Sequence, residues 1–557
     1  MAMIKRILPR LTVLVALSWA SCSREQGQNG IVIVAIEGDV DSFNPLFAEE
    51  VIAGEIGDLL YPALVGSDFD SSRGKLTYTP LLAHSWEFSP SGRDVTFHLV
   101  WGASWSDGAP ITANDVQLSY QLYADSTVAS VRQAAVENLE RFDGVQDISR
   151  SVEVVDDSTV VFHFESRSAG HLFDAGLPVL PAHVFGRIPR GELRTLRMDK
   201  DLVVSGPFLL QRWIPLQEIV LVPNPASRLP YPAKISQLVF RVIPEHASRV
   251  AQLKSGDVHL VAGLRPEDAA EIEANNPALA IISTPGRDYD FLGWNNIDPE
   301  AFGSSDGKAI RPHPLFGSAT VRRALTMAIN RDEIAKSFLG DHGRQAFGGV
   351  SPLFRWAFND TLRPLPYDPQ RALALLREEG WRDSNRDGIL DRNGKNFSFT
   401  LHIPSGNQLR GVVATVVQQQ LRNVNIEMKI EQVERGTFWD NLMGRRYDAW
   451  FAGFTVPLQM QLDDLWGSDL EKYPFNLTGF RSARVDEILA SCRTLTNEAD
   501  GGPLWKEFQV IAHQQQPCTF LFWINNIVGM NRRINDANIG VLGTTHKAWE
   551  WTVAEPQ

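Results

Sequence analysis

Cysteine is scarce in this sequence. The three that occur, Cys22, Cys492 and Cys518, form no C-x-x-C pair. Three cysteines are too few for a disulfide framework or for a zinc site built on cysteine. If Cys22 has a separate role, Cys492 and Cys518 remain either as two buried thiols, which we favour, or as one disulfide.

Motifs of common catalytic and nucleotide-binding sites are also missing. The twelve histidines include no H-E-x-x-H pair, and the chain has neither a G-x-G-x-x-G fingerprint nor a Walker A loop. No feature of the sequence supports a catalytic centre, a bound cofactor or a histidine metal centre. We therefore expect a protein that is not an enzyme and that carries no cofactor.

The balance of charge is negative, with a formal net charge of −13. Nucleic acids and anionic membrane surfaces attract basic proteins, so neither is expected as the main partner. A hydrophobic content of 44% is enough for a sizeable core, and 557 residues suggest three or four structural units.

No apolar run is long enough to cross a bilayer, which takes about 20 residues. The longest N-terminal run, residues 11–17, follows Lys5, Arg6 and Arg10 and precedes Cys22. This order resembles a bacterial lipoprotein signal, residues 1–22, in which Cys22 becomes the lipidated first residue. Residues 23–30 would form a polar tether, and the mature protein would be a membrane-anchored lipoprotein in the periplasm or at the cell surface. Ordinary signal-peptide cleavage is the alternative.

Residues 105–116 (WSDGAPITANDV) are the most informative segment. Asp107-Gly108 is a turn signal, and Thr112 with Asp115 predicts a capping box that starts a helix over 113–124. The segment resembles a recurrent string of the family 5 extracellular solute-binding proteins, the oligopeptide, dipeptide and nickel receptors of ABC importers.

Further strings typical of that family follow in the family's order. They are 80–87 (PLLAHSWE), 179–185 (VLPAHVF), 205–208 (SGPF), 251–260 (AQLKSGDVHL), 321–331 (VRRALTMAINR) and 367–381 (YDPQRALALLREEGW). In the fifth string we expect Ser318 to cap a helix whose buried stripe is Val321, Ala324, Leu325, Ala328 and Ile329, with Arg322 outside it. Residues 31–36 (IVIVAI) predict a strand buried on both faces.

The resemblance implies an α/β fold with two lobes, of the periplasmic-binding-protein type II kind (cluster C), and an extra subdomain inserted in lobe I. Hinge strands would lie near residues 284 and 516. The implied division is 30–55, 180–283 and 517–557 for lobe I, 56–179 for the inserted subdomain, and 284–516 for lobe II.

The implied ligand contacts come from loops that face the gap between the lobes. Aromatic side chains there would cover apolar ligand surface, and polar ones would fix its orientation. The predicted set is Glu37, Asp41, Phe43, Trp294, Asn295, Phe454, Thr455 and Trp466.

Residues 447–457 resemble the family's segment that ends in an aspartate pairing with the α-ammonium of a bound peptide. Here Pro457 occupies that position, and proline has neither a charge nor an N–H donor. Asp463 or Asp464 could substitute from the following loop. The replacement leaves ordinary peptides, sugars and metal chelates open as ligands.

Residues 383–391 (DSNRDGILD) match the first nine positions of a calcium-binding loop, with Asp383, Asn385, Asp387 and Asp391 as candidate ligands. Position twelve, which should be a bidentate glutamate, is Gly394. A polar turn is therefore the favoured interpretation, and a weak calcium site is the alternative.

The resulting hypothesis is a monomeric substrate-binding protein that captures a peptide or peptide-like solute by hinge closure and delivers it to an ABC permease in the inner membrane. Its contact with the membrane would be through the N-terminal lipid alone. An envelope sensor without an importer, and an enzyme on the same scaffold, are the competing hypotheses.

Overall fold

The computed structural model describes residues 30–555 except 197, 230–231 and 306. The predicted signal peptide, Cys22 and residues 23–29 of the predicted tether lie outside the described residues. Among the residues that are described, no helix is long and apolar enough to cross a membrane.

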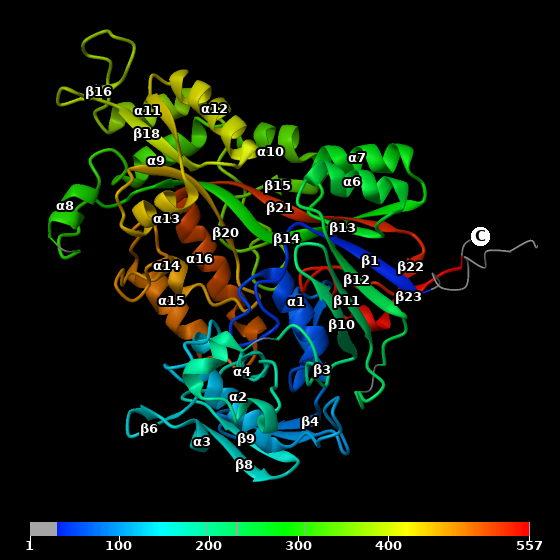
Figure 1. Ribbon diagram of the computed structural model, residues 1–557. Helices are drawn as coiled ribbons and strands as arrows, with labels where there is room; N and C mark the ends of the chain where they lie inside the picture. The colour runs from blue at the N-terminus through cyan, green and yellow to red at the C-terminus, as the bar shows by residue number, and fades with distance from the viewer. Residues whose placement is uncertain (1–29, 197, 230–231, 306, 556–557) are drawn as a thin grey trace, which may run out of the picture.

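One mixed sheet runs through both lobes of the molecule (Figure 1). In the described part of the chain it has 11 strands, with the short β15 (Gly343–Gln345) paired beside β21. The other ten strands follow one another in the order β10 (Phe208–Ile214), β11 (Glu218–Pro223), β12 (Gln237–Val242), β1 (Ile31–Ile36), β13 (Leu260–Ala262), β21 (Cys518–Asn531), β14 (Leu279–Trp294), β20 (Ala449–Thr455), β18 (Ser398–Pro404) and β19 (Glu427–Val433).

Lobe I is built around β1, which pairs in parallel with β12 and β13. Val32 and Val34 pack toward α1 (Val51–Leu60), whereas Ala35 packs toward α6 (His246–Ser255) and α7 (Pro266–Asn275). The predicted strand over 31–36, buried on both faces, is therefore confirmed.

Lobe II is built around β18, β19 and β20, with an apolar core on each face of the sheet. One face carries α9 (Ala319–Met327), α10 (Arg331–Leu339), α11 (Pro369–Glu378) and α12 (Gln408–Arg422). The other carries α13 (Arg435–Met443), α14 (Asp463–Trp466), α15 (Ala483–Arg493) and α16 (Gly502–Gln515).

Helix α9 confirms one prediction and corrects two. All five residues of the predicted stripe are almost fully buried. Arg322, expected outside the stripe, is also buried, because its guanidinium donates to the carbonyl oxygens of Gln515 and Gln516 at the end of α16. Ser318 does not cap α9, since its hydroxyl donates to the Glu379 carboxylate instead.

Two long antiparallel strands, β14 and β21, pass from lobe I to lobe II. Their pairing changes register between Thr284 and Asp288, close to the hinge expected near residue 284. Gly286 lies in this irregular stretch, and a Cβ there would be 2.1 Å from the Ile524 carbonyl oxygen. Only glycine permits this approach of the two backbones.

The inserted subdomain has its own four-stranded sheet, β4 (Ala83–Phe88), β5 (Asp94–Leu99), β9 (Thr159–His163) and β8 (Val152–Asp156). Helix α2 (Ala113–Ala124) covers it, and the predicted capping box is confirmed, with the Thr112 N–H donating to Asp115 at 2.7 Å. Its apolar core is continuous with that of lobe I. The predicted boundary at residue 56 falls inside α1.

Shorter elements complete the described chain. They are β2 (Val65–Asp70), β3 (Lys75–Pro80), β6 (Arg141–Phe142), β7 (Val145–Gln146), α3 (Ile148–Ser151), α4 (His171–Asp174), α5 (Ala182–Phe185), α8 (Pro299–Ser304), β16 (Asp391–Arg392), β17 (Lys395–Asn396), β22 (Ile534–Asn535) and β23 (Thr552–Val553). Single 3₁₀ turns cover Gln133–Val136, Arg190–Thr195, Gly340–His342, Glu498–Gly501 and Ala548–Glu550.

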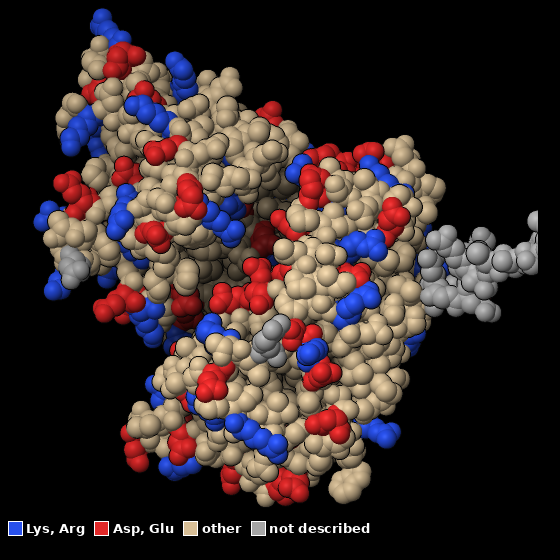
Figure 2. All heavy atoms as spheres, in the orientation of Figure 1, with Lys and Arg blue, Asp and Glu red and all other residues tan. Residues whose placement is uncertain are grey.

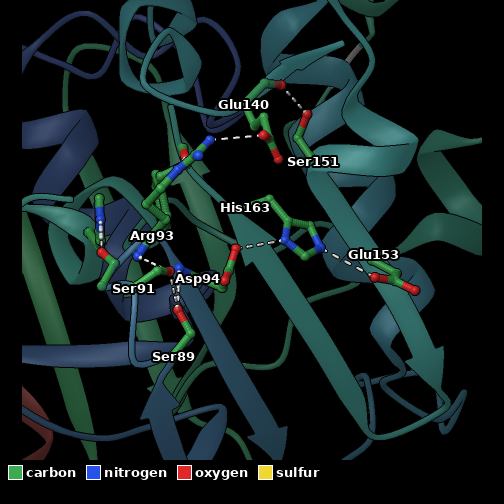
Figure 3. A network of polar contacts seen from close by, with 11 residues as sticks. Ser89, Ser91, Arg93, Asp94, Glu140, Ser151, Glu153 and His163 are labelled. Carbon is green, nitrogen blue, oxygen red and sulfur yellow. Dashed lines mark hydrogen bonds and ion pairs between the residues drawn. The ribbon is translucent and has the colours of Figure 1, made fainter. Parts of the chain in front are cut away.

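A polar network ties the strands of the inserted sheet together (Figure 3). The His163 ring lies between two carboxylates, with Nδ1 2.9 Å from Asp94 and Nε2 3.2 Å from Glu153. Beside it, Arg93 pairs with Glu140 at 2.9 Å. Asp94, His163 and Glu153 link the neighbouring strands β5, β9 and β8, so we interpret the network as structural.

The inserted subdomain also touches lobe II directly. The Ala169 N–H donates to the Leu495 carbonyl at 2.6 Å, and the Gln459 amide donates to the Gly170 carbonyl at 3.1 Å. The inserted subdomain therefore contacts both lobes.

Candidate functional site

The lobe I half of the candidate site lies at the carboxyl ends of the parallel strands β1 and β13. A pocket of about 540 Å³ opens there, and Glu37, Asp39, Glu50 and Arg249 are among its lining residues. In open α/β sheets this edge is the usual position for a ligand, because loops and helix N-termini converge on it.

The acidic side chains of this half differ in the number of hydrogen bonds that hold them in place. Glu37 is exposed, and its only described ion pair is with Arg249 at 3.4 Å. Asp39 accepts hydrogen bonds from the Trp213 indole at 3.1 Å, and Asp41 accepts from the Glu49 N–H at 2.7 Å. Glu37 is therefore free to meet a ligand, whereas Asp39 and Asp41 mainly shape the loop.

The N-terminus of α1 faces the same pocket. No side chain caps it, its first turn contains no acidic residue, and Val51 is 78% exposed. Unpaired N–H groups at a helix N-terminus favour a negative or carbonyl group nearby. The half-site thus offers both carboxylates and backbone donors to a ligand of mixed charge.

The lobe II half lies at the carboxyl ends of β18 and β20, which are also parallel. Asp288 and Thr455 are opposite each other where β14 meets the end of β20, and the Thr455 hydroxyl donates to the Asp288 carboxylate. Two pairs further in, Asp290 accepts two hydrogen bonds from Arg410, at 2.6 and 3.1 Å. Burial raises the pKa of Asp290, and the Arg410 charge opposes that rise.

The two halves face each other across an open space. Figure 2 shows the molecule hollowed at its centre, between the part built on β20 and α13 and the part built on β1 and α1 in Figure 1. Asp and Glu side chains gather along the lower edge of this hollow. The two lobes are joined by the crossing strands β14 and β21, so they can move toward each other about these strands. A ligand in the hollow would then be enclosed between them.

Three of the predicted contacts are buried in this structure. Trp294 is fully buried in the lobe II core and donates to Thr519 at 3.0 Å. Asn295 is equally buried, and its amide donates to the Tyr447 carbonyl. Trp466 is 3% exposed. Aromatic and amide side chains near a cleft strand serve core packing as readily as ligand contact, and these three pack in the core.

Of the other predicted contacts, Phe43 is also buried, packed edge-on against Trp213. Phe454 is half-buried and stacks on Phe291, with ring centroids 5.2 Å apart, and Thr455 is exposed. Glu37 lines the lobe I pocket, Asp41 and Thr455 are exposed and Phe454 is half-buried, so these four stay predictions.

Asp463 and Asp464, the predicted substitutes for the family's ammonium-binding aspartate, differ in their surroundings. Pro457 is exposed beside the end of β20. Asp463 forms an ion pair with Arg493, so its charge is already balanced. Burial raises the pKa of Asp464, and the neighbouring Asp463 raises it further.

The acidic loop after α11 forms a hydrogen-bonded turn. Asp391 accepts from the Ser384 N–H and hydroxyl, each at 2.7 Å, and these bonds lower its pKa. Asp387 accepts from the Ile389 N–H at 2.8 Å, and Asp383 accepts from the Gly388 N–H at 3.2 Å. The candidate ligands therefore hold the turn closed.

Both described cysteines are free thiols. Cys518 is buried at the start of β21, and Cys492 is half-buried in α15. Burial raises the pKa of Cys492 to about 12, so this thiol is unreactive at neutral pH.

With this geometry in place, comparison with known proteins defines the class. Residues 77–466, well over half of the chain, match the family model described as "Bacterial extracellular solute-binding proteins, family 5 Middle". The chain therefore belongs to the family 5 extracellular solute-binding proteins, as the sequence strings predicted.

Individual relatives agree with this assignment. The chain is 27% identical over 516 residues to the oligopeptide-binding protein AppA of Bacillus subtilis, which covers 90% of this chain and 88% of the relative. It is 23% identical over 547 residues to the dipeptide-binding protein of Escherichia coli K12, covering 92% and 93% of the two chains.

Solved structures confirm the predicted two-lobed fold. AppA of B. subtilis in complex with a nonapeptide superposes with a TM-score of 0.73 at 26% identity, over 94% of this chain and 99% of that one. NikA of Brucella suis in complex with Fe(III)-EDTA gives a TM-score of 0.76 at 18% identity, over 94% and 100%, which shows the fold alone.

Sequence reasoning missed two charged residues at the site, Asp288 and Arg410. Asp288 lies six residues before Trp294, the residue of β14 that was predicted as a ligand contact. The alternation of acidic and aromatic residues over 288–291 (DYDF) was the available signal.

Proposed function

We propose that this protein is the substrate-binding component of an ABC importer and that its ligand is a peptide or peptide-like solute. The observation that carries the proposal is the pairing of two half-sites, each at the carboxyl ends of parallel strands, across one hollow. The names of the relatives, which bind oligopeptides and dipeptides, support a peptide as the ligand.

The mechanism follows from the two-lobed arrangement. A ligand that touches both half-sites stabilises the closed form, because only closure brings Glu37 and Phe454 to the same molecule. The affinity gained on closure shifts the balance from open to closed. A permease can then distinguish the loaded receptor from the empty one.

Asp288 is our candidate for the missing ammonium anchor. It lies within β14, opposite Thr455 at the end of the neighbouring strand β20, and it is half-buried. Pro457 follows Thr455 by two residues. A half-buried carboxylate forms a stronger pair with an ammonium group than an exposed one does, since water screens it less. The peptide's amino terminus would then bind one strand away from the family's usual position.

The test begins with protein purified without denaturation, whose retained ligand is identified by native mass spectrometry. Small-angle scattering of the empty and loaded protein should show compaction on loading. If a ligand that binds tightly by calorimetry left the scattering profile unchanged, hinge closure would be refuted.

A matched pair of variants tests the site itself. Removing the half-buried Phe454 ring by Phe454→Ala should weaken binding about tenfold or more, the effect of losing one aromatic contact. Phe475, 45% exposed on the same lobe, provides the control, and Phe475→Ala should leave affinity unchanged. Equal effects of the two substitutions would argue against this site.

We further propose that the protein is monomeric, is not an enzyme, and is held at the membrane by lipid on Cys22. The basic and apolar residues before Cys22 support the anchor. Metabolic labelling with a radioactive fatty acid should mark the wild type and leave Cys22→Ser unlabelled. Labelling of both proteins would contradict the anchor.

A further inference from the structure

A second pocket, of about 410 Å³, lies at the opposite end of β1 from the cleft. Ile31, Ile33, Ile534 and Val553 form its apolar wall. In Figure 1 the beginning of β1 meets β22 and β23 at the outer edge of lobe I. Because Glu37 lies past the other end of the same strand, this pocket is separate from the peptide site.

The polar wall of this pocket is basic. Arg241 donates from one nitrogen to the Asp257 carbonyl at 3.0 Å, and Arg533 donates from Nε to the Ala554 carbonyl at 2.9 Å. Neither guanidinium pairs with a carboxylate within 4 Å among the described residues. Asp257 also lines the pocket, and its carboxylate accepts from the Ser255 hydroxyl at 2.6 Å. Two arginines with free donors and one acid leave a net positive charge here.

His259 adds a neutral donor to this wall. Its Nδ1 accepts the Ile33 N–H at 3.0 Å, so the proton of the neutral ring is on Nε2. Burial lowers the pKa of His259, and the nearby charges of Arg533 and Arg241 lower it further. The ring therefore stays uncharged at neutral pH unless an anion enters the pocket.

We propose that this pocket binds the phosphate of an anionic phospholipid headgroup, with Arg241 and Arg533 as its charged donors. Planar guanidinium groups bind phosphate oxygens in pairs, and the His259 Nε2–H supplies a further donor. The apolar wall formed by Ile31 and Ile33 suits the glycerol and the first methylenes of a lipid. A free inorganic phosphate would leave that wall unused.

The short sequence distance between the pocket and the proposed lipid attachment site favours a lipid over a soluble phosphate as the ligand. Ile31 lines the pocket, and Cys22 is only nine residues earlier in the sequence. Nine residues span at most roughly 30 Å. The inference rests on the proposed lipid anchor, which would hold the pocket near the bilayer. Because the chain carries a net charge of −13, we expect capture of single headgroups and no broad adhesion.

The experiment uses the secreted Cys22→Ser chain, which has no lipid, so that vesicle binding reports on the pocket alone. Co-sedimentation compares vesicles of phosphatidylcholine with vesicles that also contain phosphatidylglycerol. We expect binding only to the latter, and at least tenfold weaker binding for the double variant R241Q/R533Q. The control R377Q/R532Q removes the same charge from exposed positions outside the pocket and should bind as the unsubstituted chain does.

Two results would overturn the proposal. One is equal vesicle binding by R241Q/R533Q and by its charge-matched control. The other is calorimetric binding of inorganic phosphate without any preference for phosphatidylglycerol vesicles, which would indicate a free-phosphate site. Peptide affinity, measured on the same samples, reports separately on the proposed function, because the two pockets lie at opposite ends of β1.

Discussion

Glu498 lies where the inserted subdomain meets lobe II. Ionisation of its carboxyl group should lower the stability of the folded protein. Burial raises its pKa from an ordinary 4.5 to about 7, and the charge of Lys75 from the inserted subdomain only partly counteracts this. A carboxyl group with a raised pKa in the folded protein stabilises it at low pH, where the group is neutral. That stabilisation disappears as the pH rises from about 4.5 to about 7.

The size of the effect follows from the pKa values. A rise from 4.5 to about 7 corresponds to roughly 3 kcal/mol between the two protonation states. Glu498→Gln keeps the shape of the side chain and removes its charge. We therefore expect the variant to be more stable than the wild type by up to about 3 kcal/mol at pH 8, and to lose this advantage near pH 4.5.

Urea denaturation at several pH values between 4.5 and 8 measures this difference. The exposed Glu471 on the same lobe provides the control, and Glu471→Gln should follow the wild type at every pH. Parallel pH profiles for Glu498→Gln and the wild type would refute the reasoning, because they would show that Glu498 titrates alike in the folded and unfolded protein.

Three further substitutions test the cleft and the crossing strands. Asp288→Asn should weaken binding of peptides with a free amino terminus by about 10- to 100-fold, as expected for a lost charged hydrogen bond, and calorimetry should show no such loss for N-acetylated peptides. Arg410→Met leaves Asp290 buried without its partner, so we expect a loss of about 3–5 kcal/mol in urea denaturation, and a loss below 1 kcal/mol would contradict a buried pair. Gly286→Ala places a methyl group against the Ile524 carbonyl and should cost about 1–3 kcal/mol, whereas an unchanged melting temperature would show that the strands separate freely there.

The sequence predicted most of the fold because its signals are local. The capping box at Thr112 and Asp115 and the apolar run over 31–36 each specify an element through neighbouring residues. Arg322 escaped prediction because the carbonyl groups that bury it come from α16, almost two hundred residues later. Helical periodicity contains no information about such a partner.

The site was predicted less well for a related reason. Being near a cleft in sequence does not fix whether other elements pack over a side chain. Trp294 and Asp288 lie on the same strand, yet the first packs into the lobe II core and the second ends beside the hollow. The two positions are six residues apart and so lie on the same face of the strand, but Phe316 and Phe399, which are distant in sequence, pack against Trp294.

The continuous core beneath the inserted subdomain and lobe I limits how this protein can be engineered. Phe97 of the insert and Leu238 of lobe I belong to one apolar cluster, and neither is exposed. Removing the insert would expose apolar core residues of lobe I to water. The isolated insert would expose the apolar residues that pack against them. Chimaeras with relatives should therefore exchange both units together.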